Sequence, residues 1–127
     1  QNPINIFKCL RKHLDENDFQ DVEIEYLSGV FPYRTDMKSK WVELVKETAY
    51  SVYGLEPVVT PNMPGTGPMY EFGHVLGIPI ASAGVDHPSH RIHAPNENIL
   101  VEDLVLGAKH IALIMKNFGL QKNKKWK

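Results

Sequence analysis

The sequence is poor in cysteine and has no long apolar run. One cysteine, Cys9, occurs among 127 residues, so no disulfide can form within the chain. That content is typical of a reducing compartment, and we expect the cytoplasm. No apolar run approaches the roughly 20 residues of a membrane span, and the first residues do not resemble a signal peptide. The sequence therefore predicts no membrane partner.

An excess of charge of one sign is also lacking. The formal net charge is −1 with histidine neutral, which gives no reason to expect a nucleic-acid partner. Basic residues do gather at the end, and we expect residues 121–127 to form a disordered basic tail. The chain opens with Gln1 rather than Met, which indicates a processed or excised piece of a longer protein.

What the sequence does contain is ordinary for one globular domain, with 43% hydrophobic and 23% charged residues. Apolar spacing predicts a helix over residues 3–17, with Asn2 as its N-cap. Alternating residues predict a strand over 20–27 with one face in water. Residues 28–36 read as a connection, and a second helix is expected over 38–53, with Gly54 at its C′ position.

Short apolar runs then alternate with helical patterns. We expect strands at residues 57–60 and 78–84, a short helix at 69–77, and a last helix that Gly119 ends. Its expected inner face consists of Leu104, Ala108, Ile111, Met115 and Phe118. The alternation predicts an α/β fold with mostly parallel strands.

A glycine-rich loop precedes the short helix. Gly65 and Gly67 would let backbone N–H groups approach a ligand, and Thr66 adds a hydroxyl. A helix N-terminus near Pro68 would favour an anion, so the loop could hold a phosphate or a carboxylate. No Lys-Ser/Thr pair follows, so it is not a P-loop. A plain turn remains an equal alternative.

Three histidines lie in a later loop. His87, His90 and His93 are three residues apart, with Asp86 and Glu97 nearby. Imidazole is the commonest transition-metal ligand, so one or more of them could bind zinc. Solvent-exposed histidines in a loop are the alternative.

The two loops together resemble a known family. "GTGP" at residues 65–68 is followed, after a helix and "LGIPI", by "HAPNENI" at residues 93–99. This arrangement resembles the zinc-dependent exopeptidases and amidohydrolases of peptidase family M20. These include carnosine dipeptidase-like enzymes, glutamate carboxypeptidases, aminoacylases, acetylornithine deacetylase and succinyl-diaminopimelate desuccinylase. The resemblance covers essentially the whole chain and is strongest to the dipeptidase-like branch.

The resemblance implies a fold and a metal ligand. The chain would be the returning half of a three-layer α/β/α metallopeptidase catalytic domain over residues 29–120. A helix-strand remnant of an α+β lid domain, of the kind that dimerises, would precede it over residues 1–28. His93 would be the last ligand of a two-zinc site, with cobalt or manganese as alternative metals. Asn96 and Glu97 would shape the loop and begin the last helix.

The resemblance also implies substrate contacts. Gly65, Thr66 and Gly67 match the family segment that binds the free carboxylate of the substrate. Arg34 is a candidate substrate or lid contact, with a structural surface arginine as the alternative. His87 and His90 match no family ligand and are read as solvated or supporting groups.

The remaining family ligands and the general base belong to an amino-terminal half that no segment here matches. We therefore expect no catalytic residue in this chain, which would be the inactive carboxy-terminal part of an enzyme missing its N-terminal half. The whole enzyme would be a homo-oligomer. It would cleave an amide or peptide bond next to a free carboxylate, as a dipeptidase, carboxypeptidase or N-acyl-amino-acid deacylase, on a small peptide or an N-acyl amino acid. The alternative is a non-catalytic α/β module that self-associates or binds a small anion at the glycine loop.

Overall fold

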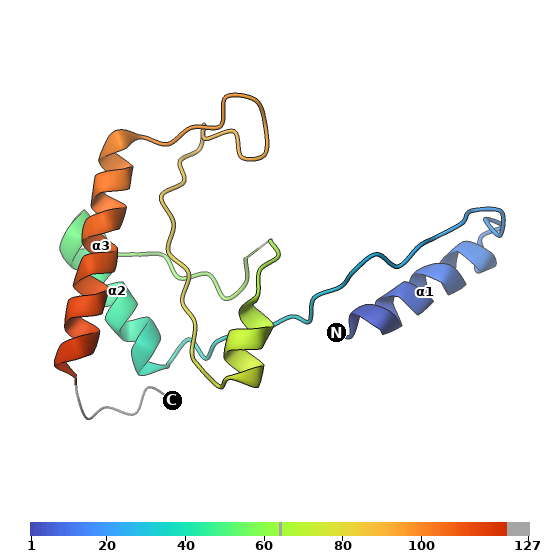
Figure 1. Ribbon diagram of the computed structural model, residues 1–127, viewed down its shortest axis with the longest axis horizontal. Coiled ribbons are helices and arrows are strands. Elements are labelled where there is room, and N and C mark those ends of the chain that lie inside the picture. The colour runs from blue at the N-terminus through green and yellow to red at the C-terminus, as the bar shows by residue number, and fades with distance from the viewer. Residues whose placement is uncertain (64, 122–127) are drawn as a thin grey trace. The chain divides into compact units, whose positions relative to one another are not determined.

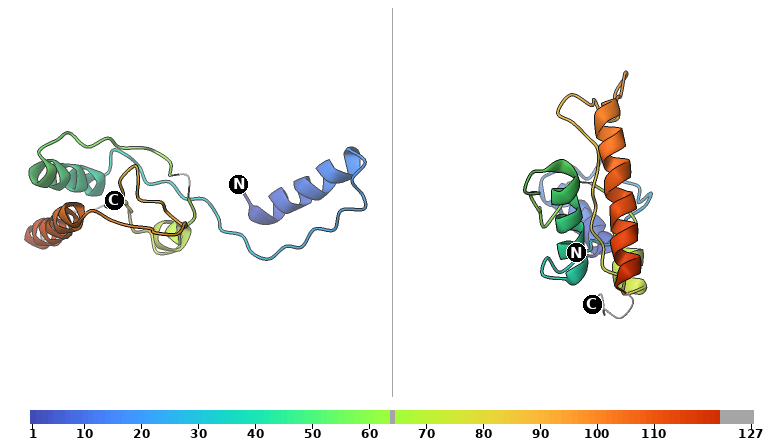
Figure 2. Two further views of the ribbon diagram at one scale, coloured as in Figure 1. Left: turned by 90° about the horizontal axis from the view of Figure 1, so that it is seen from above. Right: turned by 90° about the vertical axis from the view of Figure 1, so that its left-hand side faces the viewer.

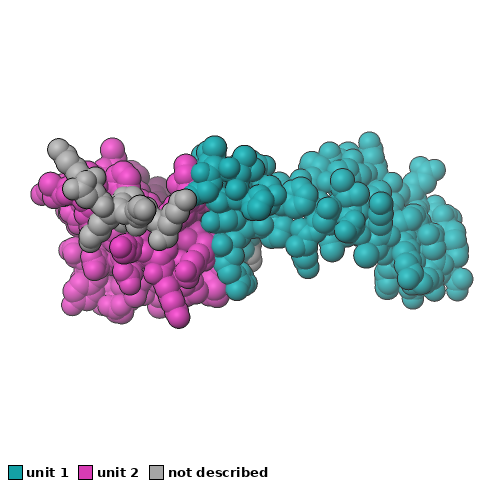
Figure 3. Space-filling model, turned by 90° about the horizontal axis from the view of Figure 1, so that it is seen from below, with its two compact units in different colours: residues 1–34, 62–77 teal, residues 35–61, 78–127 magenta. Residues whose placement is uncertain are grey.

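The computed structural model describes residues 1–63 and 65–121 and is built from helices joined by extended segments (Figure 1). The helices are α1 (Pro3–Glu16), α2 (Lys40–Tyr53), the π-helix η1 (Glu71–Val75) and α3 (Val101–Leu120). Figure 3 colours two compact units. Unit 1 comprises residues 1–34 and 62–77, and unit 2 comprises residues 35–61 and 78–127.

The expected α/β fold is wrong for this chain, because the described residues contain helices and no strand. The three strand-like segments, residues 22–27, 57–60 and 78–84, run without regular structure. A strand needs a hydrogen-bonded neighbour, and an alternating pattern predicts only which side chains share a face. The amide of Ile80, for example, donates to the hydroxyl of Thr35 at 3.1 Å rather than to a strand partner.

Helix α1 begins where its cap predicts. The Oδ1 atom of Asn2 accepts hydrogen bonds from the amides of Ile4 and Asn5, at 2.9 and 3.4 Å. No residue of α1 is buried. The segment after α1 runs back along it (Figure 1), and the rings of Phe7 and Tyr26 meet edge-on at 5.4 Å between centroids. The helix is therefore held by local contacts within unit 1.

Helices α2 and α3 pack side by side and form the core of unit 2 (Figures 1 and 2). Leu44 and Val45 of α2 are buried with Ile114 of α3, and Trp41 and Ala81 pack against them. Helix α2 ends as its sequence predicts, because Gly54 adopts the left-handed conformation with φ of 69°.

The predicted inner face of α3 is wrong. His110 and Ile114 are the buried residues of this helix. Four residues predicted to face inward are about half exposed or more, namely Leu104 (53%), Ile111 (51%), Met115 (69%) and Phe118 (48%). Apolar side chains occur around most of α3, so periodicity could not select the buried side. The helix also continues through Gly119 to Leu120.

A buried polar group joins the two packed helices. The Nε2 atom of His110 lies 3.2 Å from the Thr48 hydroxyl and 3.2 Å from the Val45 carbonyl oxygen. Because a carbonyl oxygen only accepts, Nε2 is the atom that carries the proton. The Thr48 hydroxyl in turn donates to the Leu44 carbonyl at 2.9 Å.

In the part of the chain that the structure describes, no helix has both the length and the apolar character needed to cross a bilayer. The predicted basic tail, apart from Gln121, which caps α3, lies outside the described residues. The predicted domain boundary after residue 28 differs from the division into compact units and stays a prediction.

Candidate functional site

Arg34 lies against the start of the glycine loop in unit 1. Its Nε and Nη2 atoms donate to Oδ1 of Asn62, at 3.1 and 2.7 Å. Asn62 precedes Gly65, Thr66 and Gly67 by a few residues in the same loop. A hydrogen bond therefore connects Arg34 to the loop that contains the other candidate substrate contacts, although the two lie in separate segments of the sequence.

The glycines of this loop are not required by the chain itself. Neither Gly65 nor Gly67 has a positive φ, since the positive-φ glycines of the described residues are Gly54 and Gly77. A Cβ atom at Gly65 would come no closer than 3.4 Å to the flexible end of Met63. At Gly67 the nearest atom is likewise a methionine Cε, at 3.4 Å. Space and backbone conformation therefore leave this loop open to a close approach from outside.

The helix expected after the loop does begin next to Pro68, with residues 69–70 α-helical, but it is short. The element there is the five-residue π-helix η1, whose N-cap, Tyr70, makes no capping hydrogen bond through its side chain. So short an element supplies little of the dipole on which the anion argument relied. The neighbouring aromatic side chains stack instead, with Tyr70 between Phe31 at 4.9 Å and His74 at 4.7 Å.

The histidine loop of unit 2 is closed by consecutive turns. The amide of Asn98 donates to the carbonyl of His90 at 3.0 Å, and the amide of Ala94 donates to that of Arg91 at 3.0 Å. The Asn98 side chain also donates to the Asn96 carbonyl at 2.9 Å. The last helix begins only at Val101, so the expectation that Asn96 and Glu97 open it is wrong.

His87 is engaged at both ring nitrogens. The amide of Ser89 donates to its Nδ1 at 3.3 Å, so Nδ1 accepts and Nε2 carries the proton. Nε2 then donates to Oδ1 of Asn98 at 3.0 Å. His90 directs its Nδ1 to the His87 carbonyl oxygen. These contacts make His87 a structural part of the loop.

His93 differs from both in having a free, exposed ring. Its backbone is left-handed, with φ of 58°, and its amide lies 3.3 Å from Oε2 of Glu97. Its ring nitrogens have no hydrogen-bond partner among the residues that the structure describes. A neutral imidazole of this kind can donate a lone pair to zinc, so His93 fits the role of a single metal ligand.

His93 and the glycine loop belong to different units. Over residues 1–63 and 65–121, no three His, Cys, Asp or Glu side chains gather in a way that could hold a metal ion. The alternative of a three-histidine site within this loop therefore has no geometric support in the described chain.

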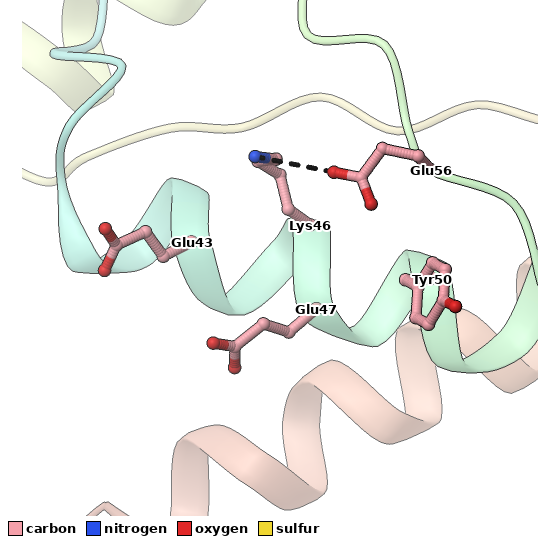
Figure 4. Close-up of a pocket in the computed structure, with 5 residues that line it drawn as sticks. All are labelled: Glu43, Lys46, Glu47, Tyr50 and Glu56. Atoms are coloured by element: carbon pink, nitrogen blue, oxygen red, sulfur yellow. Dashed lines mark ion pairs between the residues drawn. The ribbon is translucent and has the colours of Figure 1, made fainter.

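A shallow hollow of 290 Å³ lies along α2 in unit 2 (Figure 4). Its lining residues are Glu43, Lys46, Glu47, Tyr50 and Glu56. Lys46 points towards Glu56, at 3.9 Å, while the other two carboxylates point away from that pair. These are solvated surface charges and do not form a convergent site.

Two asparagines of these loops were missed by the sequence analysis. Asn62 holds Arg34, and Asn98 connects the two ends of the histidine loop. Asparagine is common in loops, and the partners of Asn62 and Asn98 lie 28 and 11 residues away, respectively. No local signal in the sequence could have identified them.

These features leave one histidine with a free, exposed ring and one open glycine loop as candidate site residues, and comparison with known families identifies the chain. Residues 3–117 match peptidase family M20/M25/M40. The chain belongs to this family. No curated protein matches it.

A solved structure supports the same assignment. An M20 family metallo-carboxypeptidase, Sso-CP2 from Sulfolobus solfataricus, matches with 35% identity and a TM-score of 0.71. The match covers 91% of this chain and 27% of that one, so the chain spans about a quarter of the length of the metallo-carboxypeptidase. Family and neighbour together place this chain in a lineage of metal-dependent hydrolases.

Proposed function

We propose that this chain is the substrate-anchoring, C-terminal part of a two-metal-ion hydrolase that cleaves an amide or peptide bond next to a free carboxylate. Dipeptides, C-terminal residues of peptides and N-acyl amino acids are the substrate class. Membership of family M20/M25/M40 and the metallo-carboxypeptidase neighbour support the chemistry.

One observation carries the substrate class: Arg34 is held by two hydrogen bonds to Asn62, three residues before Gly65. It is exposed and has no carboxylate within ion-pair distance among the described residues. A guanidinium with free N–H groups binds a carboxylate through two parallel hydrogen bonds. Open glycine backbone beside it lets the rest of the carboxyl end approach closely. We propose that Arg34, Gly65, Thr66 and Gly67 together hold the carboxylate.

His93 supplies one ligand to the metal site in this proposal. Zinc, or cobalt or manganese in its place, would polarise the scissile carbonyl and lower the pKa of a bound water. The turns around His93 fix its backbone, so little ordering remains when its ring binds a metal. The other ligands and the general base come from the missing N-terminal half.

By itself the chain is then inactive, because one imidazole cannot hold two ions, and an imidazole that binds a metal cannot also serve as the general base. Hydrolysis of a dipeptide by the purified chain with added zinc, above the rate of the buffer, would contradict this. A cytoplasmic homo-oligomer remains the expected state of the whole enzyme.

The carboxylate site is tested by titrating the chain with acetylglycine and with the neutral acetylglycinamide, observed through amide and Arg34 Nε–H resonances. Acetylglycine is expected to bind more tightly and to shift Arg34 and Thr66. Arg34→Gln should weaken its binding about tenfold or more, because a charge-assisted pair is lost. Equal shifts with the two probes would contradict a carboxylate site.

A further inference from the structure

The Arg34–Asn62 contact is unusual in how it uses the guanidinium. Both donor atoms, Nε and Nη2, point at one acceptor, Oδ1 of Asn62. Only the oxygen of an amide accepts, so the orientation of the Asn62 side chain is fixed by its partner. Arginine has five N–H donors, and this arrangement leaves three of them, on Nη1 and Nη2, without a role in the contact.

The remaining donors form the outer edge of the guanidinium. Nη1 and Nη2 lie side by side there and match the spacing of two carboxylate oxygens. With its other edge anchored to Asn62, the planar group cannot turn freely about its long side chain. Anchoring of this kind lowers the conformational entropy lost when a ligand binds.

Asn62 also leaves the charge of Arg34 intact. An aspartate in its place would make the same two contacts and neutralise the guanidinium. Elsewhere in the described chain, arginine and lysine do pair with carboxylates, as Arg11 does with Asp15 at 2.7 Å. The neutral amide at residue 62 fixes the position of Arg34 without supplying a competing anion.

We propose that Asn62 is a positioning residue, which holds Arg34 by one edge so that the other edge and the full positive charge meet the carboxylate of the substrate. This inference rests on the proposed function. Asn62 would act on the substrate only through Arg34. The need to keep Arg34 charged explains why residue 62 is an amide rather than an acid.

Two variants of the 127-residue chain test it with the same probes. Asn62→Asp preserves shape and hydrogen bonding, and its ion pair with Arg34 should keep the thermal midpoint at or above that of the wild type. Acetylglycine should nevertheless bind about tenfold more weakly, because Arg34 is already neutralised. Asn62→Ala removes the anchor alone, and binding should weaken about fivefold through lost ordering. If Asn62 had a purely structural role, a variant that keeps the thermal midpoint of the wild type would also keep its affinity for acetylglycine.

The outcomes separate this inference from the proposed function. If the wild-type chain binds acetylglycine no better than acetylglycinamide, the carboxylate site itself is wrong, and this inference falls with it. A second outcome is that the wild type binds acetylglycine more tightly than acetylglycinamide while both variants bind acetylglycine as tightly as the wild type does. In that case the carboxylate site stands and the role of Asn62 is overturned. Should Asn62→Asp fail to fold, the comparison of Asn62→Ala with the wild type decides by the same criterion.

Discussion

A Cβ atom on Gly73 would overlap the ring of Tyr33, whereas one on Gly67 would meet only the flexible end of Met69. Gly73 is buried, so packing within unit 1 explains why residue 73 has no side chain. Gly67 is only partly buried and has no such explanation inside the described chain. Our account assigns its small size to the approach of a ligand.

Alanine at these two positions should therefore have opposite effects. Gly73→Ala is expected to lower the free energy of unfolding by about 1–3 kcal/mol, because the Tyr33 ring must move. Gly67→Ala should change it by less than about 0.5 kcal/mol yet weaken acetylglycine binding. Chemical denaturation and the acetylglycine titration measure the two effects. Gly67→Ala binding the probe as the wild type does would contradict a ligand-facing role.

The contact between α2 and α3 depends on a buried histidine as well as on apolar packing. His110 and Thr48 are 2% and 1% exposed, and both reach backbone carbonyl groups of α2. The ring of Tyr53 meets that of His110 edge-on at 5.7 Å. A polar pair that is fully satisfied in this way fixes how the two helices face each other.

Removing the Thr48 hydroxyl should cost about 1 kcal/mol. In Thr48→Val the contact with His110 and the hydrogen bond to the Leu44 carbonyl are lost, but the His110 Nε2–H keeps the Val45 carbonyl as acceptor, so no buried donor is left unpaired. His110→Ala should cost about 3 kcal/mol, since it also empties space between the helices. Urea denaturation gives both values. The exposed Thr60→Val is the matched control, expected within about 0.5 kcal/mol of the wild type. Thr48→Val indistinguishable from that control would refute the buried hydrogen bond.

Local signals predicted the start of α1 and the end of α2, whereas both ends of α3 and the distant contacts escaped prediction. Asn2 and Gly54 cap their helices through neighbouring atoms, so the sequence near them suffices. Strand pairing depends on a partner elsewhere in space, and the pattern at residues 78–84 could not show that none is present in the described chain. The buried side of α3 was equally hidden, because apolar residues occur around the helix.

The candidate site shows the same division. His93 and the glycine loop were identified from short motifs whose residues are contiguous. The Arg34–Asn62 contact spans 28 residues of sequence and joins two irregular segments, so nothing local indicates it. The tautomer of His87 is set by the hydrogen bond that its Nδ1 accepts from the Ser89 amide, and this contact can be identified only from the structure.

At the scale of the whole molecule, our proposal gives the anchoring groups to this chain and the reacting groups to further residues of the enzyme. It matches 27% of a metallo-carboxypeptidase, and α3 leaves large apolar side chains such as Met115 exposed. Exposed apolar surface of this kind is usually covered in an assembled protein. Both observations support the proposal that further residues complete the metal site.

Calorimetric titration of the purified chain with zinc tests this central claim most directly, with His93→Ala and the exposed His13→Ala run beside the wild type. Complete structural zinc sites bind with about 10–16 kcal/mol, which no single imidazole provides. The account predicts no tight, stoichiometric binding by any of the three. Tight one-to-one binding that His93→Ala abolishes and His13→Ala preserves would contradict it, because the chain would then hold a complete metal site of its own.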